Sequence, residues 1–190
     1  MSFPRFVLLV FWVLCVTLNA FAQQATEPMV NNEFVQKEFG ANCSLVGMAP
    51  LQADLNGDGV EDIVIPARCT SPMMDEGEQN YVVVDPYNAF FGYGNPKITT
   101  QFSTENPERR GFSLLIIHGA GADAWHSASP KAKFLIVNLP YKSVYVKRMA
   151  VKKKVHLAIF VDETGGDAMT SAIFWDGKKY RYQPMGSNME

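Results

Sequence analysis

The sequence predicts a mainly β protein, an antiparallel meander or sandwich or a set of partial propeller-like sheets, with one short helix near the N-terminus of the mature chain. Short apolar runs rich in β-branched residues recur along the chain and are bounded by turn residues. The stretches between them lack the helical spacing that the crossovers of a parallel sheet require. Asp176-Gly177 stands between two such runs and is typical of a tight hairpin turn.

The N-terminal residues predict a secretory signal peptide at 1–22. Arg5 supplies a basic start, an apolar stretch follows, and Ala20-Phe21-Ala22 has the small residues of a cleavage site. The apolar stretch is shorter than the roughly 20 residues of a membrane-spanning helix, and no later segment reaches that length. We therefore expect a periplasmic or secreted protein without a transmembrane segment in the mature chain. Cleavage near Ala22 would leave a flexible leader at 23–32 and a single β-rich domain at 33–190.

The helix and the strands follow in order. Asn31 or Asn32 can cap a short helix that runs through Phe39 and stops at Gly40. The residues from 45 to 51 are a broken apolar lead-in. The predicted strands are Val60–Ala67, Tyr81–Val84, Phe112–Ile117, Lys133–Leu139, Ser143–Ala150, Val155–Val161, Thr170–Trp175 and Lys178–Tyr182.

Two patterns relate these strands to one another. Asp176-Gly177 predicts a two-residue type I′ turn between the last two strands, because both central positions of that turn need positive φ. A coarse rhythm of strand, polar loop and strand suggests three sheet-like units. These would pair 60–67 with 81–84, 112–117 with 133–139, and 155–161 with 170–175.

The aromatic and glycine-rich stretch from 85 to 100 has two interpretations. Tyr87, Phe90, Phe91 and Tyr93 could form an exposed platform for a glycan or a peptide. They could instead fold back as a small satellite core beneath a long loop, which is the commoner arrangement.

Charge excludes one class of partner. The chain carries 17 Lys and Arg against 19 Asp and Glu, a formal net charge of −2. The chain as a whole therefore lacks the net positive charge typical of a nucleic-acid-binding protein, and we expect no nucleic-acid partner. We interpret Lys152-Lys153-Lys154 as a charged turn or edge that discourages pairing between sheet edges rather than as a binding patch.

Two cysteines remain after the signal peptide, Cys43 and Cys69. In an oxidising compartment, one disulfide explains them more simply than a metal pair does. The bridge would close a loop of about 26 residues, for which chain entropy gives about 3 to 4 kcal/mol of stabilisation.

The stretch from 54 to 62 has the ligand order of a calcium loop. Calcium prefers oxygen ligands, and alternate acidic or amide positions let a tight loop turn several of them toward one ion. Gly59 permits the sharp bend. The expected ligands are the side chains of Asp54, Asn56, Asp58 and Asp62 and the carbonyl of Val60. An EF-hand would place a Glu where Ile65 stands and continue into a helix, so that motif is excluded. The alternative is a solvated turn rich in Asp and Asn that binds no ion.

This loop, with the apolar strand after it, resembles the FG-GAP and VCBS repeats of integrin α-chain propellers and many secreted bacterial proteins. Those loops read D-x-[DN]-x-D-G-x-x-D, and Asp54, Asn56, Asp58, Gly59 and Asp62 match. The resemblance implies the same ligands and a structural Ca²⁺. The motif occurs once here, so we expect neither a complete propeller nor its adhesion role.

The strongest catalytic candidate is His118-Gly119-Ala120-Gly121, which is reminiscent of the oxyanion loop of α/β-hydrolases. The G-x-S-x-G elbow of those enzymes is absent from the sequence, although Ser127 and Ser129 lie near His126. His118 and His126 lack the spacing of a metal pair. We therefore expect a non-catalytic, calcium-stabilised module that binds an unknown protein or polysaccharide. The alternative is a small hydrolase that uses the His118–Ser129 loop.

Overall fold

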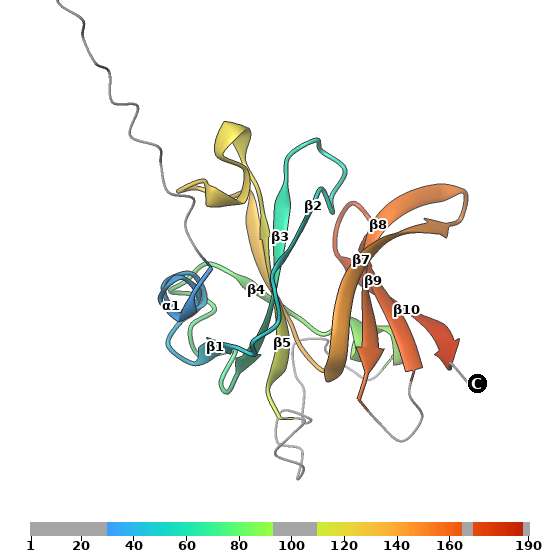
Figure 1. The fold of residues 1–190 in the computed structure, drawn as a ribbon, viewed down its shortest axis with the longest axis horizontal. Helices are drawn as coiled ribbons and strands as arrows, with labels where there is room; N and C mark the ends of the chain where they lie inside the picture. Colours follow the sequence, from blue (N-terminus) through green and yellow to red (C-terminus); the bar gives the residue numbers. More distant parts are fainter. Residues whose placement is uncertain (1–29, 93–109, 165–168, 188–190) are drawn as a thin grey trace, which may run out of the picture.

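The computed structural model describes residues 30–92, 110–164 and 169–187, and it consists of two β-sheets packed face to face with a helix on the far side of the first (Figure 1). The mainly β prediction with a short N-terminal helix is confirmed. The predicted signal peptide and most of the predicted leader lie outside the described residues. Among the described residues, no helix is long and apolar enough to span a bilayer.

The first sheet, sheet A, has the order β1-β3-β5-β6-β4, and β2 pairs with the start of β3. Its neighbours are antiparallel except for β4 and β6, which run parallel. Its strands are β1 (Cys43–Leu45), β2 (Leu51–Ala53), β3 (Asp62–Cys69), β4 (Val82–Val84), β5 (Phe112–His118) and β6 (Ala132–Ile136).

The expected pairing of 60–67 with 81–84 is wrong. β3 pairs with β5 instead, and β4 joins the far edge of the sheet beside β6. The expectation of wholly antiparallel sheets fails at this parallel pair. A helical crossover is not needed there, because the chain between β4 and β6 also supplies β5, which lies within the same sheet. The expected pairing of 112–117 with 133–139 is confirmed.

β3 continues past Ala67, the last residue of the predicted strand, although Pro66 lies within it. β2 pairs with residues 62–64 and β1 with residues 67–69, so Pro66 lies opposite the gap between these two short strands. A residue without an N–H group is tolerated where no neighbouring strand needs a ladder bond from it. The strand can therefore run on to Cys69, where it pairs with Cys43.

The second sheet, sheet B, is a meander with the order β10-β9-β8-β7. It confirms the expected pairing of 155–161 with 170–175. Its strands are β7 (Tyr141–Val151), β8 (Lys154–Glu163), β9 (Met169–Trp175) and β10 (Tyr180–Ser187).

Of the two turns at one end of sheet B, one differs from expectation. Tyr180 pairs with Trp175, so four residues and not two connect β9 to β10. Asp176 organises this longer turn, since its Oδ1 accepts hydrogen bonds from the N–H groups of Lys178 and Lys179. The two-residue turn belongs to the β7–β8 hairpin, where Lys152 and Lys153 confirm the expected charged turn.

Both faces of sheet A are buried, which explains the continuous apolar runs of β3 and β5. One face packs against α1 (Asn32–Phe39) through Val35 and Phe39. The other packs against the inner face of sheet B, with Val64 and Ile116 meeting Ile159 in one cluster. Tyr141, the first residue of β7, links the layers, because its hydroxyl lies 3.1 Å from the Ala67 carbonyl and 3.0 Å from the Ser113 carbonyl.

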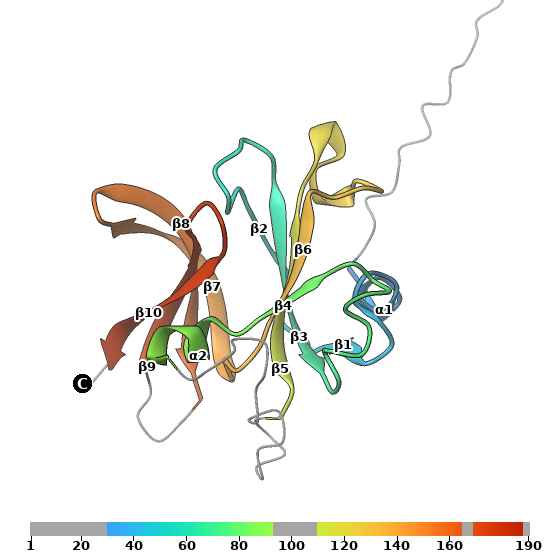
Figure 2. The ribbon, with the colours of Figure 1, turned by 180° about the vertical axis from the view of Figure 1, so that it is seen from behind.

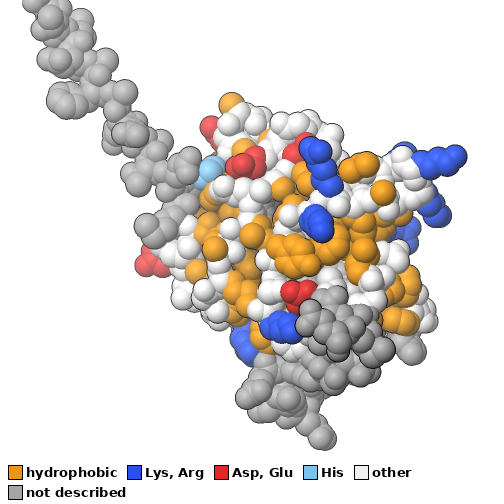
Figure 3. All heavy atoms as spheres, turned by 45° about the vertical axis from the view of Figure 1, so that its right-hand side comes forward, with side chains coloured by type: hydrophobic (Ala, Val, Ile, Leu, Met, Phe, Trp, Pro, Cys, Tyr) orange, Lys and Arg blue, Asp and Glu red, His pale blue; other side chains and the backbone are white. Residues whose placement is uncertain are grey.

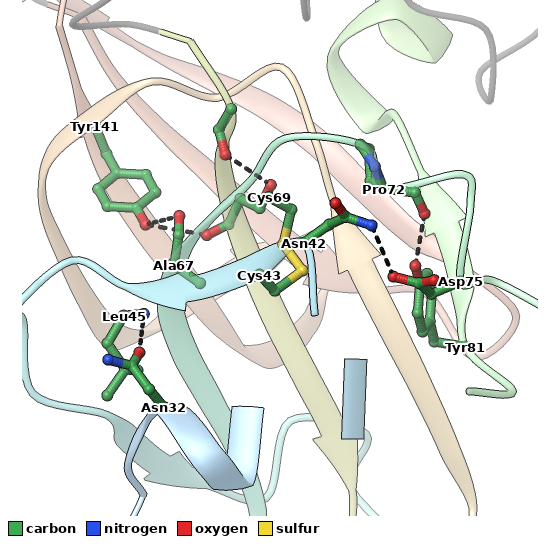
Figure 4. Close-up of a disulfide and its surroundings, with 12 residues drawn as sticks. Asn32, Asn42, Cys43, Leu45, Ala67, Cys69, Pro72, Asp75, Tyr81 and Tyr141 are labelled. Atoms are coloured by element: carbon green, nitrogen blue, oxygen red, sulfur yellow. Dashed lines mark hydrogen bonds between the residues drawn. A yellow bond between two sulfur atoms is a disulfide. The ribbon is translucent and has the colours of Figure 1, made fainter. Parts of the chain in front are cut away.

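The predicted helix and disulfide are both present. The Oδ1 atom of Asn31 accepts the N–H of Phe34 at 2.8 Å, and Gly40 ends α1 with φ of 95°. Figure 4 shows the Cys43–Cys69 bridge, which joins the opposed ends of β1 and β3. Asn32 extends this attachment, because its side chain accepts the N–H of Leu45 in β1. The bridge therefore fixes β1 to β3, and the Asn32 bond fixes α1 to β1.

A short helix that the sequence did not predict, α2 (Pro86–Phe91), occupies the start of the aromatic stretch. It lies beside β10 (Figure 2), and Tyr87, Phe90 and Phe91 all contact the ring of Tyr182. These rings form a satellite cluster, although Phe90 and Phe91 remain 48% and 43% exposed. The rest of that stretch, including Tyr93, lies outside the described residues.

Candidate metal-binding loop

The loop from 54 to 62 closes where Ala53 of β2 pairs with Asp62 of β3. It lies at the same end of sheet A as η2 (Gly121–His126), the 3-10 segment that follows β5 (Figure 2). The loop therefore has two neighbours that are distant in sequence, η2 with the residues before it and the start of β6.

The Asp54 carboxylate is the centre around which the loop folds. Its Oδ1 accepts the N–H groups of Gly57 at 2.8 Å and Asp58 at 3.1 Å, and its Oδ2 accepts the N–H of Gly59 at 2.9 Å. Gly57 and Gly59 adopt positive φ, 77° and 82°, which glycine reaches without strain. The sequence thus produces a tight turn wrapped around one carboxylate.

The next two expected ligands continue this pattern. Asn56 Oδ1 accepts the N–H of Asp58 at 3.0 Å, and Asp58 Oδ1 accepts the N–H of Val60 at 2.9 Å. The other oxygen of Asp58 lies 2.6 Å from the ammonium of Lys131, just before β6. The hydrogen bond from Lys131 lowers the pKa of Asp58, outweighing the effect of slight burial. A cationic group thus already lies against one of the predicted ligand oxygens.

Asp62, the last predicted ligand, is fully buried at the base of the loop. Its Oδ2 accepts the N–H of Leu55 at 2.9 Å, and its Oδ1 accepts the N–H of Gly119 at 2.9 Å. Burial raises its pKa to about 6, although these bonds favour the charged form. The carboxylate therefore joins the loop to the segment after β5.

Gly119 is required at this junction by close packing. A Cβ atom there would lie 2.3 Å from the Glu61 carbonyl oxygen and 2.7 Å from the Ala124 carbonyl carbon. Both are backbone atoms, so a side chain would force the two segments apart. The glycine that first suggested an oxyanion loop is thus accounted for by packing and by its bond to Asp62.

His118 lies inside the core beneath the loop. It is 3% exposed, its Nε2 lies 2.7 Å from the Tyr180 hydroxyl, and its ring contacts those of Phe134 and Trp175. Burial lowers its pKa to about 4, which keeps the imidazole neutral at physiological pH. This is the environment of a structural histidine between two sheets.

The serines of the proposed hydrolase loop interact with each other. The Ser129 N–H donates to the Ser127 Oγ at 3.2 Å. His126 stacks on Trp125, with ring centroids 3.6 Å apart, and Trp125 packs against Phe34 of α1. Within the described ranges, no hydrogen bond joins a histidine of this segment to either serine.

The donor chemistry of the loop suits a hard cation. Asp54, Asn56 and Asp58, together with the Val60 carbonyl, offer oxygen atoms alone, which is the set that Ca²⁺ favours. The Lys131 ammonium stands where such a set attracts positive charge. In the described part of the chain, no three His, Cys, Asp or Glu side chains already form a metal-holding group.

Two residues that contact the loop, Lys131 and Gly119, could not have been identified from the sequence. Lys131 is 73 residues from Asp58, and Gly119 is 57 residues from Asp62. Neither carries a local signal for this contact, because the order of strands in sheet A brings them together.

Comparisons of this chain with protein-family models, with curated proteins and with solved structures gave no match.

Proposed function

We propose that this chain is a non-catalytic periplasmic or secreted β domain that binds a protein or polysaccharide ligand, with Ca²⁺ bracing the loop from 54 to 62. The observation that carries the calcium proposal is the paired arrangement of Asp58 and Lys131. An ammonium 2.6 Å from Asp58 Oδ2 marks the position where the loop attracts a cation. The resemblance of the loop to FG-GAP and VCBS repeats supports the same ion.

Of the five predicted ligands, Asp54, Asn56, Asp58 and the carbonyl of Val60 would hold the ion, and Asp62 would support the loop from its base through its bonds to Leu55 and Gly119. Bound Ca²⁺ would supply positive charge to a loop that contains several carboxylates, and so oppose their mutual repulsion. The protein prepares the loop by turning backbone N–H groups onto Asp54 and by fixing Asp62 at its base. Extracellular modules bind Ca²⁺ at about 10⁻⁴ to 10⁻³ M, which is sufficient for bracing a turn outside the cytoplasm.

The disulfide supports the proposed compartment. Cys43 and Cys69 are joined, and such bridges persist in oxidising environments. The hydrolase alternative has no comparable support, because His118 is buried against Tyr180 and, among the described residues, no hydrogen bond joins a histidine of this segment to Ser127 or Ser129. The binding role is therefore the better proposal.

The ion site is tested by melting temperature with calcium and with a chelator. Asp58→Asn should abolish a calcium-dependent rise in melting temperature, because it removes one charged ligand. Glu61→Gln is the matched control, since Glu61 is an exposed carboxylate of the same loop that is not a predicted ligand. Equal melting of the wild-type protein in calcium and in chelator would overturn the ion proposal.

A further inference from the structure

One end of sheet B concentrates positive charge. The segments 147–154 and 176–181 contain eight Lys or Arg and a single acid, Asp176, which gives a formal charge of +7 in a chain whose net charge is −2. All eight basic residues are exposed. Arg181 pairs with Asp176 at 2.5 Å, and the other seven have no acidic partner among the described residues. Sheet B therefore presents a strongly basic end on an otherwise acidic protein.

A groove of about 530 Å³ lies between the two hairpins at this end. Lys152 and Lys154 of the β7–β8 hairpin line one side, and Arg181 of β10 lines the other. Phe174 and His156 contribute to its floor, with ring centroids 5.1 Å apart. Pockets of this volume accommodate a few residues of peptide or a small molecule.

Apolar side chains support the floor of the groove. Met149, Ala158, Phe160 and Phe174 form a cluster on the outer face of sheet B, which neither sheet A nor a helix of the described chain covers. Figure 3 shows Lys and Arg side chains bordering an apolar area on this side of the molecule. The surface thus combines positive charge with apolar contact area.

The hairpin turn places its lysines at a conformational cost. Lys152 and Lys153 have φ of 45° and 70°, the left-handed region that Asn-Gly normally occupies in such turns. Protection of a sheet edge does not explain Lys152 and Lys153, because these two lysines form the turn that connects the paired strands β7 and β8. Strained residues of this kind cluster at functional sites.

We propose that this groove, bounded by Lys152, Lys154 and Arg181 and floored by Phe174, docks an acidic peptide segment of a partner protein that carries an apolar side chain. Carboxylates of the peptide would meet the lysines, and the apolar side chain would lie over Phe174. Charge complementarity of this kind speeds association and selects the partner.

A polysaccharide and an anionic membrane fit the shape and the exposed surface of the groove less well than a peptide does. A sugar stacks on the open face of an aromatic ring, but Phe174 and Tyr182 are only 7% and 3% exposed. The exposed part of Phe174 is enough for an aliphatic side chain to touch but too small for a sugar to stack on. A flat anionic membrane can reach the two turns but not a floor recessed between them. A peptide can enter the groove and contact both sides.

This inference rests on the proposed binding role and gives it a surface and a ligand class, but it does not require calcium. Asp58 belongs to the loop of sheet A, and the groove belongs to sheet B. Asp58→Asn should therefore leave peptide binding unchanged. Failure of the calcium test and failure of the groove test are separate results.

The test is fluorescence anisotropy with a labelled peptide of six glutamates around a central leucine. The variant Lys152→Asn/Lys153→Gly removes two charges and supplies the residues that the turn prefers, so its melting temperature should not fall. We expect it to weaken peptide binding about tenfold. The control Lys37→Gln/Lys142→Gln removes two exposed charges elsewhere and should change binding less than about twofold.

Further probes identify the class of ligand. Replacing the leucine of the peptide by serine should weaken binding to the wild-type protein, because the contact with Phe174 is lost. Absence of peptide binding, or equal effects of the two double variants, would overturn the proposal. Preferential binding of oligogalacturonate or of phosphatidylglycerol vesicles would also overturn it, in favour of a polysaccharide or a membrane.

Discussion

The backbone N–H of Gly119 lies 2.9 Å from Oδ1 of the buried Asp62 carboxylate, and this bond connects the candidate ion loop to the segment that follows β5. The approach is close enough to exclude any side chain at Gly119. Stability of the loop is therefore linked to a residue that the sequence suggested for catalysis.

Gly119→Ala should lower the free energy of unfolding by about 1 to 3 kcal/mol, because the new methyl group overpacks against the backbone of Glu61 and Ala124. Gly77→Ala is the matched control, since a Cβ there meets nothing within 4 Å. Its effect should stay within about 0.5 kcal/mol. Urea unfolding measures both, and equal losses would contradict the packing argument.

Lys131→Met should tighten calcium binding if the ion occupies the proposed site, because the ammonium near Asp58 Oδ2 repels Ca²⁺ and competes for that oxygen. We expect a gain in affinity of about fivefold, which is the size of an exposed ion pair. Isothermal titration calorimetry measures it. Lys142→Met removes an exposed charge from β7 and should have no effect, whereas weaker binding by Lys131→Met would contradict the competition.

His118 should make stability depend on pH. Burial lowers its pKa from 6.5 to about 4, so its stabilising contribution is complete above pH 6.5 and is lost as the pH falls to about 4. At pH 5 this loss is about 2 kcal/mol. In metal-free protein, Asp62 has the opposite effect on stability. Burial raises its pKa from 3.8 to about 6, so its contribution to the free energy of unfolding is lost as the pH rises from 3.8 to about 6.

His118→Gln separates these two effects. The amide of glutamine can still bond to the Tyr180 hydroxyl, but it does not titrate. Between pH 7 and pH 5, the stability of the variant relative to the wild-type protein should rise by about 2 kcal/mol. Urea unfolding at the two pH values measures the change, and a constant difference would contradict the role of His118.

Cys43→Ala/Cys69→Ala should lower the free energy of unfolding by about 3 to 4 kcal/mol, because the unfolded chain regains the entropy of a 26-residue separation. The reduced wild-type protein should lose a similar amount. Guanidinium unfolding with and without reductant measures this, and identical midpoints for the oxidised and reduced proteins would contradict it.

Local chemistry made much of the fold predictable. The Asn31 cap and Gly40 define α1, and β-branched runs define most strands. The order of strands was less accessible, because β4 carries no signal that selects β6 over β3 as its neighbour. The prediction of a two-residue turn at Asp176-Gly177 was also wrong, because the Asp176 side chain stabilises a turn of four residues.

The candidate site was likewise predictable only in part. Spacing alone identified the oxygen-bearing residues of the loop, which fold around Asp54. It did not reveal that Asp62 turns to buried N–H groups or that Lys131 reaches Asp58, because those contacts depend on β5 and β6. Charge segregation at the end of sheet B likewise requires the topology, which brings residues 147–154 and 176–181 together.

The succession of the two sheets along the chain affects how the protein is made. Sheet A is complete in sequence by Ile136, whereas the strands that cover one of its faces come from residues 141–187. In a chain that emerges N-terminus first, from the ribosome or across a membrane, the apolar face of β3 and β5 therefore stays bare until the last quarter of the chain follows. Sheet B, a meander of consecutive strands, needs only neighbouring contacts to form, so it can cover that face as soon as it emerges.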